Sequence, residues 1–227
     1  MLGISLDVTD NDRIPDVVSE VLRQVGRIDV LVNNAGHTQV GAAEETTDRE
    51  LRDIMDVHFF GPAALTRAVL PQMRRRGSGA IVQMSSIGGQ LSFAGFSAYS
   101  ATKCALEGYS EALAAEVNPL GIRVLIVEPG SFRTNLFGSA RHESSAMPVY
   151  EATVGPTRAM INNTAGKQPG DPVRAAAAIL AALEAEKPPL RLVLGGDAVD
   201  GISAHLDSVR RDLETWEPVS RQTGFDD

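Results

Sequence analysis

The sequence predicts a doubly wound α/β fold, in which helices cover both faces of a parallel sheet. Short apolar segments alternate along the chain with longer segments of helical periodicity, and continuously apolar strands are typical of sheets buried on both faces. The connections between the segments are short and marked by Gly or Pro, as in compact α/β proteins. Ligands of such folds bind beside the carboxyl ends of the strands.

Each element follows from a local pattern. Strands are expected where short apolar runs occur, at residues 2–8, 28–32, 80–84, 121–127 and 190–194. Helices are expected where apolar residues recur with helical spacing, at residues 12–25, 48–76, 98–117, 171–186 and 198–216. Helix boundaries support this assignment: residues 9–12 form a cap region, and 171–172 place proline directly after a capping Asp. Gly and Pro at 61–62 predict a kink or break in the long helix 48–76.

We expect one domain over residues 1–227, because this length suits a single core of ordinary size. Residues 136–170 lose periodicity and become richer in small, polar and Pro residues, which predicts a lid over a substrate site. Residues 198–227 are expected to form a C-terminal helix and tail.

Composition excludes several classes of partner. The net charge of −8 and pI near 5.0 argue against nucleic acid and anionic membranes. Cys104 is the only cysteine, so no intrachain disulfide can form, and it is expected in the core of a helix face. The chain has no apolar run long enough to span a bilayer and no basic leader, which predicts a cytoplasmic location. The histidines lack metal-ligand spacing, so we expect no metal site.

Tyr99 and Lys103 stand four residues apart at the start of a predicted helix, and therefore on one face. A phenol has an ordinary pKa near 10, and a nearby ammonium lowers that pKa by stabilising the phenolate. The pair can therefore act as a proton donor and acceptor. Such spacing alone usually means a solvated helix face, so the neighbouring motifs decide between the two interpretations.

Those motifs follow the ends of predicted strands. Ser86 ends a buried strand and stands thirteen residues before Tyr99. Small residues that let a ligand approach the backbone end two other strands, in Asn33-Asn34-Ala35-Gly36 and in Pro129-Gly130-Ser131-Phe132-Arg133-Thr134. The alternative for the first of these is a tight turn that only braces the sheet.

In this order and spacing, the four motifs resemble those of the short-chain dehydrogenases/reductases, and the likeness runs from Leu6 to about Leu194. The resemblance implies that Tyr99 exchanges a proton with the substrate oxygen and that Ser86 orients this oxygen. It implies that Lys103 binds the ribose of NAD or NADP and lowers the Tyr99 pKa. Further residues implied to contact this cofactor are Asp7 and Val8 at the adenine, Asn33, Ala35 and Gly36 along it, and Pro129, Gly130 and Thr134 at its carboxamide and phosphate side.

The sequence departs from the family pattern at its start. Family members begin with a strand, a Gly-rich turn and a helix that hold the pyrophosphate, whereas Met1 stands only six residues before Asp7. The resemblance therefore implies a Rossmann-like fold without its first β-α-β unit, about fifty residues. Two explanations stay open: a start-site error or fragment of a normal enzyme, or a genuine truncated product with little activity. In either case, we expect strand 2–8 to pair with strand 28–32.

A second departure is His58, which occupies the position of the fourth family catalytic residue, usually Asn. The Asn positions a water that links Lys103 to solvent, and an imidazole can also bind a water, with a different response to pH. The alternative is that His58 only packs within the kinked helix.

The main hypothesis is an NAD(P)-dependent oxidoreductase that interconverts a carbonyl and a secondary alcohol on a small molecule. Phe137, Met147, Tyr150 and Met160 give the lid an apolar character, which hints at a partly hydrophobic substrate. The resemblance also implies a homo-oligomer, a dimer or tetramer. The alternative class is a non-catalytic interaction protein on the same fold, with helix faces 48–70 and 98–117 as a dimer surface. A hydrolase is disfavoured because no G-x-S-x-G motif occurs.

Overall fold

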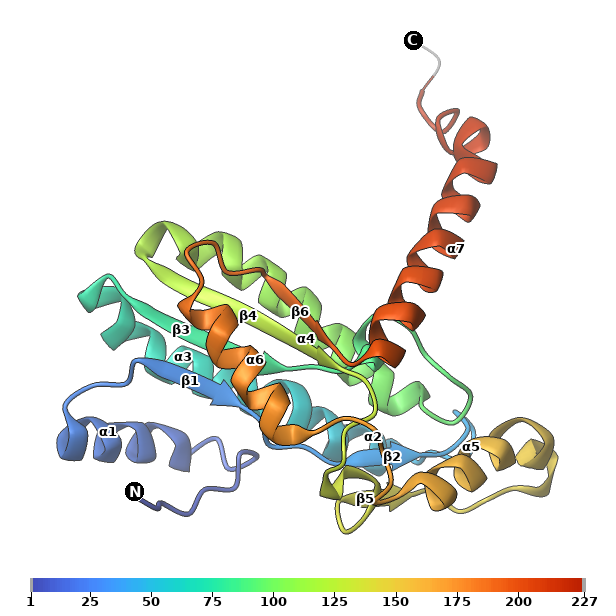
Figure 1. Ribbon diagram of the computed structural model, residues 1–227, viewed down its shortest axis with the longest axis horizontal. Coiled ribbons are helices and arrows are strands. Elements are labelled where there is room, and N and C mark those ends of the chain that lie inside the picture. The colour runs from blue at the N-terminus through green and yellow to red at the C-terminus, as the bar shows by residue number, and fades with distance from the viewer. Residues whose placement is uncertain (1, 226–227) are drawn as a thin grey trace.

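A four-stranded parallel sheet forms the centre of the protein, in a computed structural model that describes residues 2–225 (Figure 1). The strands lie in the order β1 (Val30–Asn33), β3 (Gly79–Met84), β4 (Ile122–Pro129) and β6 (Arg191–Leu194). Val82 of β3 lies opposite Val32 of β1 and Leu125 of β4, which fixes the register. The inner strands β3 and β4 are almost fully buried, whereas β1 is an edge strand.

Helices cover both faces of this sheet, so the predicted doubly wound α/β fold is confirmed. One face carries α1 (Arg13–Val25), α3 (Gly61–Arg76) and α4 (Ser97–Val117), and the other carries α6 (Pro172–Glu184). Alternate strand residues point to opposite faces. Ile81 and Val124 therefore pack under α3 and α4, while Val82 and Leu125 pack under α6.

The predicted helix 48–76 is continuous but contains one wide turn. α2 (Asp48–Met55) runs into a π-turn over Asp56–Phe60, and α3 follows without a break. Pro62 does not end the helix; it is the second residue of α3 and lies directly after the π-turn. The kink therefore takes the form of a π-turn, a common cause of helix irregularity.

The start of α6 follows the predicted signal, whereas the Asp12 side chain makes no capping hydrogen bond at the start of α1. Asp171 caps α6 by accepting a hydrogen bond from the Val173 N–H at 2.8 Å. α3 ends at Gly77, whose φ of +66° lies in the left-handed region that favours glycine. Short 3₁₀ turns lie at Ile87–Gly89, Asn118–Leu120, Asn135–Phe137 and Pro148–Tyr150.

A second, two-stranded parallel sheet joins the predicted lid, residues 136–170, to the body. It pairs β2 (Thr38–Val40) with β5 (Arg141–Glu143), and α5 (Glu151–Thr164) follows in the lid. The sequence pattern predicts none of these three elements. Strands of three residues are too short to show an alternating pattern, and α5 contains Gly and Pro that obscure its periodicity.

The C-terminal helix α7 (Gly196–Ser220) projects from the body (Figure 1). Ala198 and Ile202 near its start are buried, whereas Leu206, Leu213 and Trp216 are more than half exposed. None of the helices formed by residues 2–225 combines the length and apolar character needed to cross a membrane.

Three predictions are wrong: the strand at residues 2–8, its pairing with residues 28–32, and the burial of Cys104. Residues 2–8 form no strand, and β1 pairs with β3 alone among the described strands. Asp7 instead caps a turn, since its carboxylate accepts hydrogen bonds from the Thr9 N–H at 2.9 Å and hydroxyl at 2.8 Å. Cys104 is exposed instead of buried, because α4 turns Lys103 and Leu106 toward the core.

Candidate active site

Three strand ends and the start of α4 meet at one edge of the sheet. Ser86 follows β3 in an extended conformation (φ −166°, ψ 164°), and its hydroxyl oxygen accepts a hydrogen bond from the Gly88 N–H at 3.1 Å. This contact fixes the Ser86 side chain at the start of a 3₁₀ turn. Tyr99 and Lys103 lie in the first turns of α4, both over 90% buried.

Lys103 lies between the Tyr99 ring and strand β3. Its Nζ donates a hydrogen bond to the Met84 carbonyl oxygen at 2.8 Å and lies 5.6 Å from the centroid of the Tyr99 ring. The spacing in the sequence therefore does place the phenol and the ammonium on one buried face, beside the end of β3.

Burial moves the pKa values of these two groups in opposite directions, because it disfavours whichever form is charged. It raises the pKa of Tyr99, an effect that the neighbouring Ser86 hydroxyl opposes. It lowers the pKa of Lys103 to about 8, against the influence of the Glu107 carboxylate. The expected lowering of the Tyr99 pKa by Lys103 is therefore not found, since the ammonium is turned to the Met84 carbonyl.

Two cavities meet at Tyr99. The larger cavity, about 510 Å³, is lined by Lys103, His58 and the strand ends; the smaller cavity, about 400 Å³, lies under the lid. Five residues line both cavities, namely Ser86, Tyr99, Gly130, Phe132 and Leu136. A molecule in each cavity would therefore meet its neighbour beside the Ser86 and Tyr99 hydroxyls.

The predicted cofactor residues divide between those that line the larger cavity and those that do not. Its lining includes Gly36, Lys103, Pro129, Gly130 and Thr134. Asp7, Val8, Asn33 and Ala35 line neither cavity.

Asn33 has a different place from the one expected. Its side-chain Nδ2 donates a hydrogen bond to Gln83 Oε1 at 2.8 Å within the buried interior. The residue thus joins β1 to β3, which favours the bracing alternative for this part of the motif.

His58 lies at the centre of the π-turn and is 1% exposed. Its Nε2 accepts a hydrogen bond from the His37 N–H at 3.2 Å, so Nδ1 carries the proton and donates to Thr102 Oγ1 at 2.9 Å. The Thr102 hydroxyl in turn donates to the Tyr99 carbonyl oxygen at 2.7 Å. Both ring nitrogens thus have protein partners, and burial together with the Lys103 charge lowers the His58 pKa to about 2.

A buried carboxylate that the sequence did not single out holds the segment carrying Ser86. Glu107 accepts hydrogen bonds from the Ser85 hydroxyl at 2.5 Å and from Gln90 Nε2 at 2.5 Å, at the two ends of that segment. Arg191 of β6 pairs with Glu107, Glu128 and Glu111. One signal was available, because Glu107 stands four residues after Lys103, on the same helix face.

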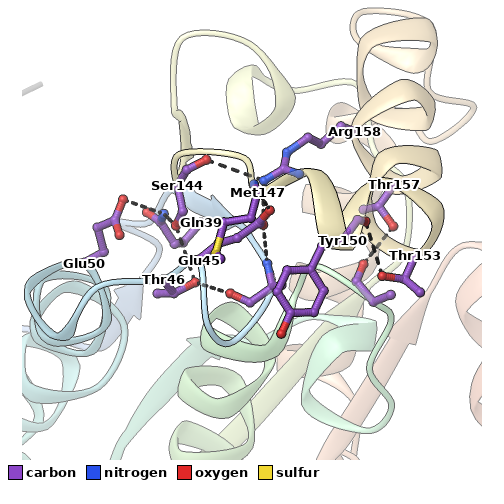
Figure 2. Close-up of polar contacts among 12 residues, drawn as sticks. Gln39, Glu45, Thr46, Glu50, Ser144, Met147, Tyr150, Thr153, Thr157 and Arg158 are labelled. Carbon is purple, nitrogen blue, oxygen red and sulfur yellow. Dashed lines mark hydrogen bonds and ion pairs between the residues drawn. The ribbon is translucent and has the colours of Figure 1, made fainter.

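A second buried carboxylate, Glu45, ties the predicted lid to the body (Figure 2). It accepts hydrogen bonds from the N–H groups of Ala42 and Met147, each at 2.7 Å, and from Arg158 Nη2 of α5 at 2.8 Å. These partners, with Arg158 the first among them, lower the Glu45 pKa to about 2. Of the lid residues singled out in the sequence, Phe137 and Met160 line the smaller cavity, and Met147 and Tyr150 do not.

Comparison with known proteins identifies the class that this fold and site define. Residues 1–145 match the short chain dehydrogenase family. Oxidoreductase BOA17 of Botryotinia fuckeliana is 35% identical over 217 residues, 96% of this chain and 79% of that protein. The chain therefore belongs to the short chain dehydrogenase family, whose members are oxidoreductases.

Solved structures agree with this assignment. The crystal structure of a short-chain dehydrogenase from Streptomyces avermitilis superposes with a TM-score of 0.92 and is 66% identical, over 97% of this chain and 80% of that one. A gluconate 5-dehydrogenase from Burkholderia cenocepacia J2315, in complex with NADP and tartrate, has a TM-score of 0.57 and 28% identity, over 59% of this chain and 52% of that one. No group of three or more His, Cys, Asp or Glu side chains within residues 2–225 could hold a metal ion.

Proposed function

We propose that the protein is an NAD(P)-dependent oxidoreductase that interconverts a carbonyl group and a secondary alcohol. One observation carries the proposal: Ser86 and Tyr99 line both cavities at the place where these meet. In this interpretation, the larger cavity holds the nicotinamide half of the cofactor and the smaller one holds the substrate. Residues 136–170 then act as the lid within a single domain.

The residues of the larger cavity fit the nicotinamide half of NAD or NADP. Lys103 supplies an ammonium, Ser86 and Thr134 supply hydroxyls, and Ile179 and Leu194 supply apolar walls. A ribose needs polar partners of this kind, and a flat aromatic ring needs walls of this kind. The Burkholderia relative binds NADP, which supports the same cofactor class for this chain. When bound, the nicotinamide would supply or accept the hydride.

The chain's own residues then handle the substrate oxygen and its proton. Tyr99 donates the phenolic proton to this oxygen in reduction and accepts it in oxidation, while the Ser86 hydroxyl holds the oxygen in place. Lys103 would hold the ribose hydroxyls of a bound cofactor, and its positive charge in the same cavity as Tyr99 would favour the phenolate. His58 positions Tyr99 through Thr102, since neither of its ring nitrogens is left for a water.

The test is Tyr99→Phe, with Tyr109→Phe on the same helix as its matched control. Tyr99→Phe removes only the hydroxyl, so turnover of an accepted alcohol should fall by at least about 100-fold, while Tyr109→Phe should leave it within about twofold. Thermal shifts with NADH and NADPH should stay the same in both variants. Turnover near wild-type level in Tyr99→Phe contradicts the assigned role, and the absence of a thermal shift with either cofactor favours the non-catalytic alternative.

A further inference from the structure

The smaller cavity has walls that are mostly apolar. Leu91, Phe93, Phe96, Phe137 and Met160 contribute to its lining. A volume of about 400 Å³ lies in the range of sites for small organic ligands. Such a lining binds a hydrocarbon portion by removing its surface from water.

The only charge in the lining of the smaller cavity, among the described residues, is negative. Among the described residues that line it, Asp197 is the single charged side chain, and Lys, Arg and His are absent. The Asp197 carboxylate is held in place, because its Oδ2 accepts a hydrogen bond from the Ser131 N–H at 2.7 Å. A Cβ at Gly130 would lie 2.4 Å from its Oδ1, so glycine is needed for the carboxylate to lie there. A substrate carboxylate in this cavity would face a fixed negative charge and find no cation to pair with.

Two buried polar atoms in the lining have no partner. The side-chain Oε1 of Gln168 and the hydroxyl of Ser100 make no hydrogen bond with any described residue. Their residues are 3% and 5% exposed, and both line the smaller cavity. Buried polar atoms in folded proteins are nearly always paired, so these two atoms are suited to a ligand with hydrogen-bonding groups of its own.

We infer that the substrate is a mainly apolar ketone or alcohol without a negative charge, carrying a second hydrogen-bonding group that Gln168 binds. Asp197 excludes carboxylate-bearing substrates from the same cavity. The inference rests on the proposed function, since the reacting carbon must lie beside Tyr99 and Ser86 while the remainder of the molecule occupies the smaller cavity.

Three methyl ketones of one chain length provide the test: 2-octanone, 8-hydroxyoctan-2-one and 7-oxooctanoate. They differ only at the far end, which is a methyl, a hydroxyl or a carboxylate. The expected order of kcat/KM in the wild type is hydroxyl, then methyl, then carboxylate, with about tenfold between neighbours. Equal or faster turnover of the carboxylate overturns the inference.

Two variants assign the selectivity to residues. Gln168→Leu should abolish the preference for the hydroxyl over the methyl ketone, because a leucine of similar size offers no hydrogen bond. Asp197→Asn keeps an acceptor for the Ser131 N–H, and should raise the relative kcat/KM of the carboxylate about tenfold. Asp200→Asn, on the same helix but outside the cavity lining, is the matched control and should leave all ratios unchanged. Unchanged ratios in Gln168→Leu or Asp197→Asn contradict the inference.

Calorimetric binding of the three ketones separates this inference from the proposed function, because binding needs no turnover. The same order of affinities without any turnover overturns the proposed function, and then only the binding preference of the smaller cavity for uncharged, hydrogen-bonding ligands stands. Turnover in the reverse order overturns the inference alone, and so does binding of none of the three compounds.

Discussion

Histidine 58 is a side chain whose protonation state the surrounding structure determines. Its two ring nitrogens are occupied by the His37 N–H and the Thr102 hydroxyl, and burial lowers its pKa to about 2. The imidazole therefore stays neutral at any physiological pH. A residue that never gains charge there acts through its shape and hydrogen bonds alone.

This neutrality has a measurable effect on stability. The folded pKa of His58 is about 2 against 6.5 in a free imidazole, so below pH 6.5 the unfolded chain binds a proton that the folded chain refuses. As the pH is lowered below 6.5, the free energy of unfolding should therefore decrease, by up to about 1.4 kcal/mol per pH unit from this residue. In His58→Asn the slope between pH 6 and pH 4 should be shallower by that amount in chemical denaturation. Equal slopes in the two proteins would mean that His58 titrates in the folded state.

Glu107 gives a second prediction, about activity. Its carboxylate raises the pKa of Lys103 and holds the ends of the segment that carries Ser86. Glu107→Gln should lower kcat/KM by about tenfold and shift the alkaline fall of the pH–rate profile below pH 8. Glu111→Gln is the control, since Glu111 shares Arg191 but contacts neither Ser85 nor Gln90. A lower kcat/KM without the shift in the pH–rate profile would mean that Glu107 has only a structural role.

At the scale of elements, the buried ion pair between Glu45 and Arg158 is one of the contacts that hold the predicted lid to the body. The side chains of Glu45 and Arg158 are 0% and 13% exposed, so water screens the pair little. Arg158→Met should lower the free energy of unfolding by about 3 kcal/mol, because it leaves a buried carboxylate without its cation. It should also speed amide exchange in residues 144–164.

The matched control is Arg174→Met. Arg174 pairs with Asp171 at 3.8 Å, with side chains 90% and 50% exposed, and such surface pairs contribute less than about 1 kcal/mol. Equal losses in the two variants would show that the lid is held by other contacts.

The elements that the sequence predicts correctly are those long enough to show a periodic pattern of apolar residues. β3, β4 and α4 carry unbroken patterns and hold Ser86, Pro129, Gly130, Tyr99 and Lys103, so the centre of the site was predictable. β2 and β5 are too short, and their pairing depends on residues about a hundred positions apart. The run at residues 2–8 has the composition of a strand, yet a strand also needs a neighbour to pair with. The absence of the family's first β-α-β unit stays a prediction.

At the scale of the whole molecule, α7 has little support from the body. Beyond Ile202 its apolar residues Leu206, Val209, Leu213 and Trp216 are half exposed or more. Most of the stability of a helix in a protein comes from packing one of its faces against the body, and this part of α7 has little such packing. Amides of residues 206–220 should therefore exchange much faster than those of α4 in hydrogen exchange. Slow exchange that disappears on dilution would instead show that a second copy of the chain covers the helix, as the expected oligomer allows.

The wide turn at Asp56–Phe60 leaves the helices before and after it about one residue out of phase. Removing a single residue there would restore regular winding and rotate everything upstream by roughly 100° relative to α3. The hydrogen bond between Gln39 and Glu50 would then be lost, and so would the one between the His58 imidazole and the Thr102 hydroxyl. Deleting one residue from Asp56–Phe60 should thus disturb the packing of α2 more than most point substitutions in this turn, although the resulting helix would be more regular.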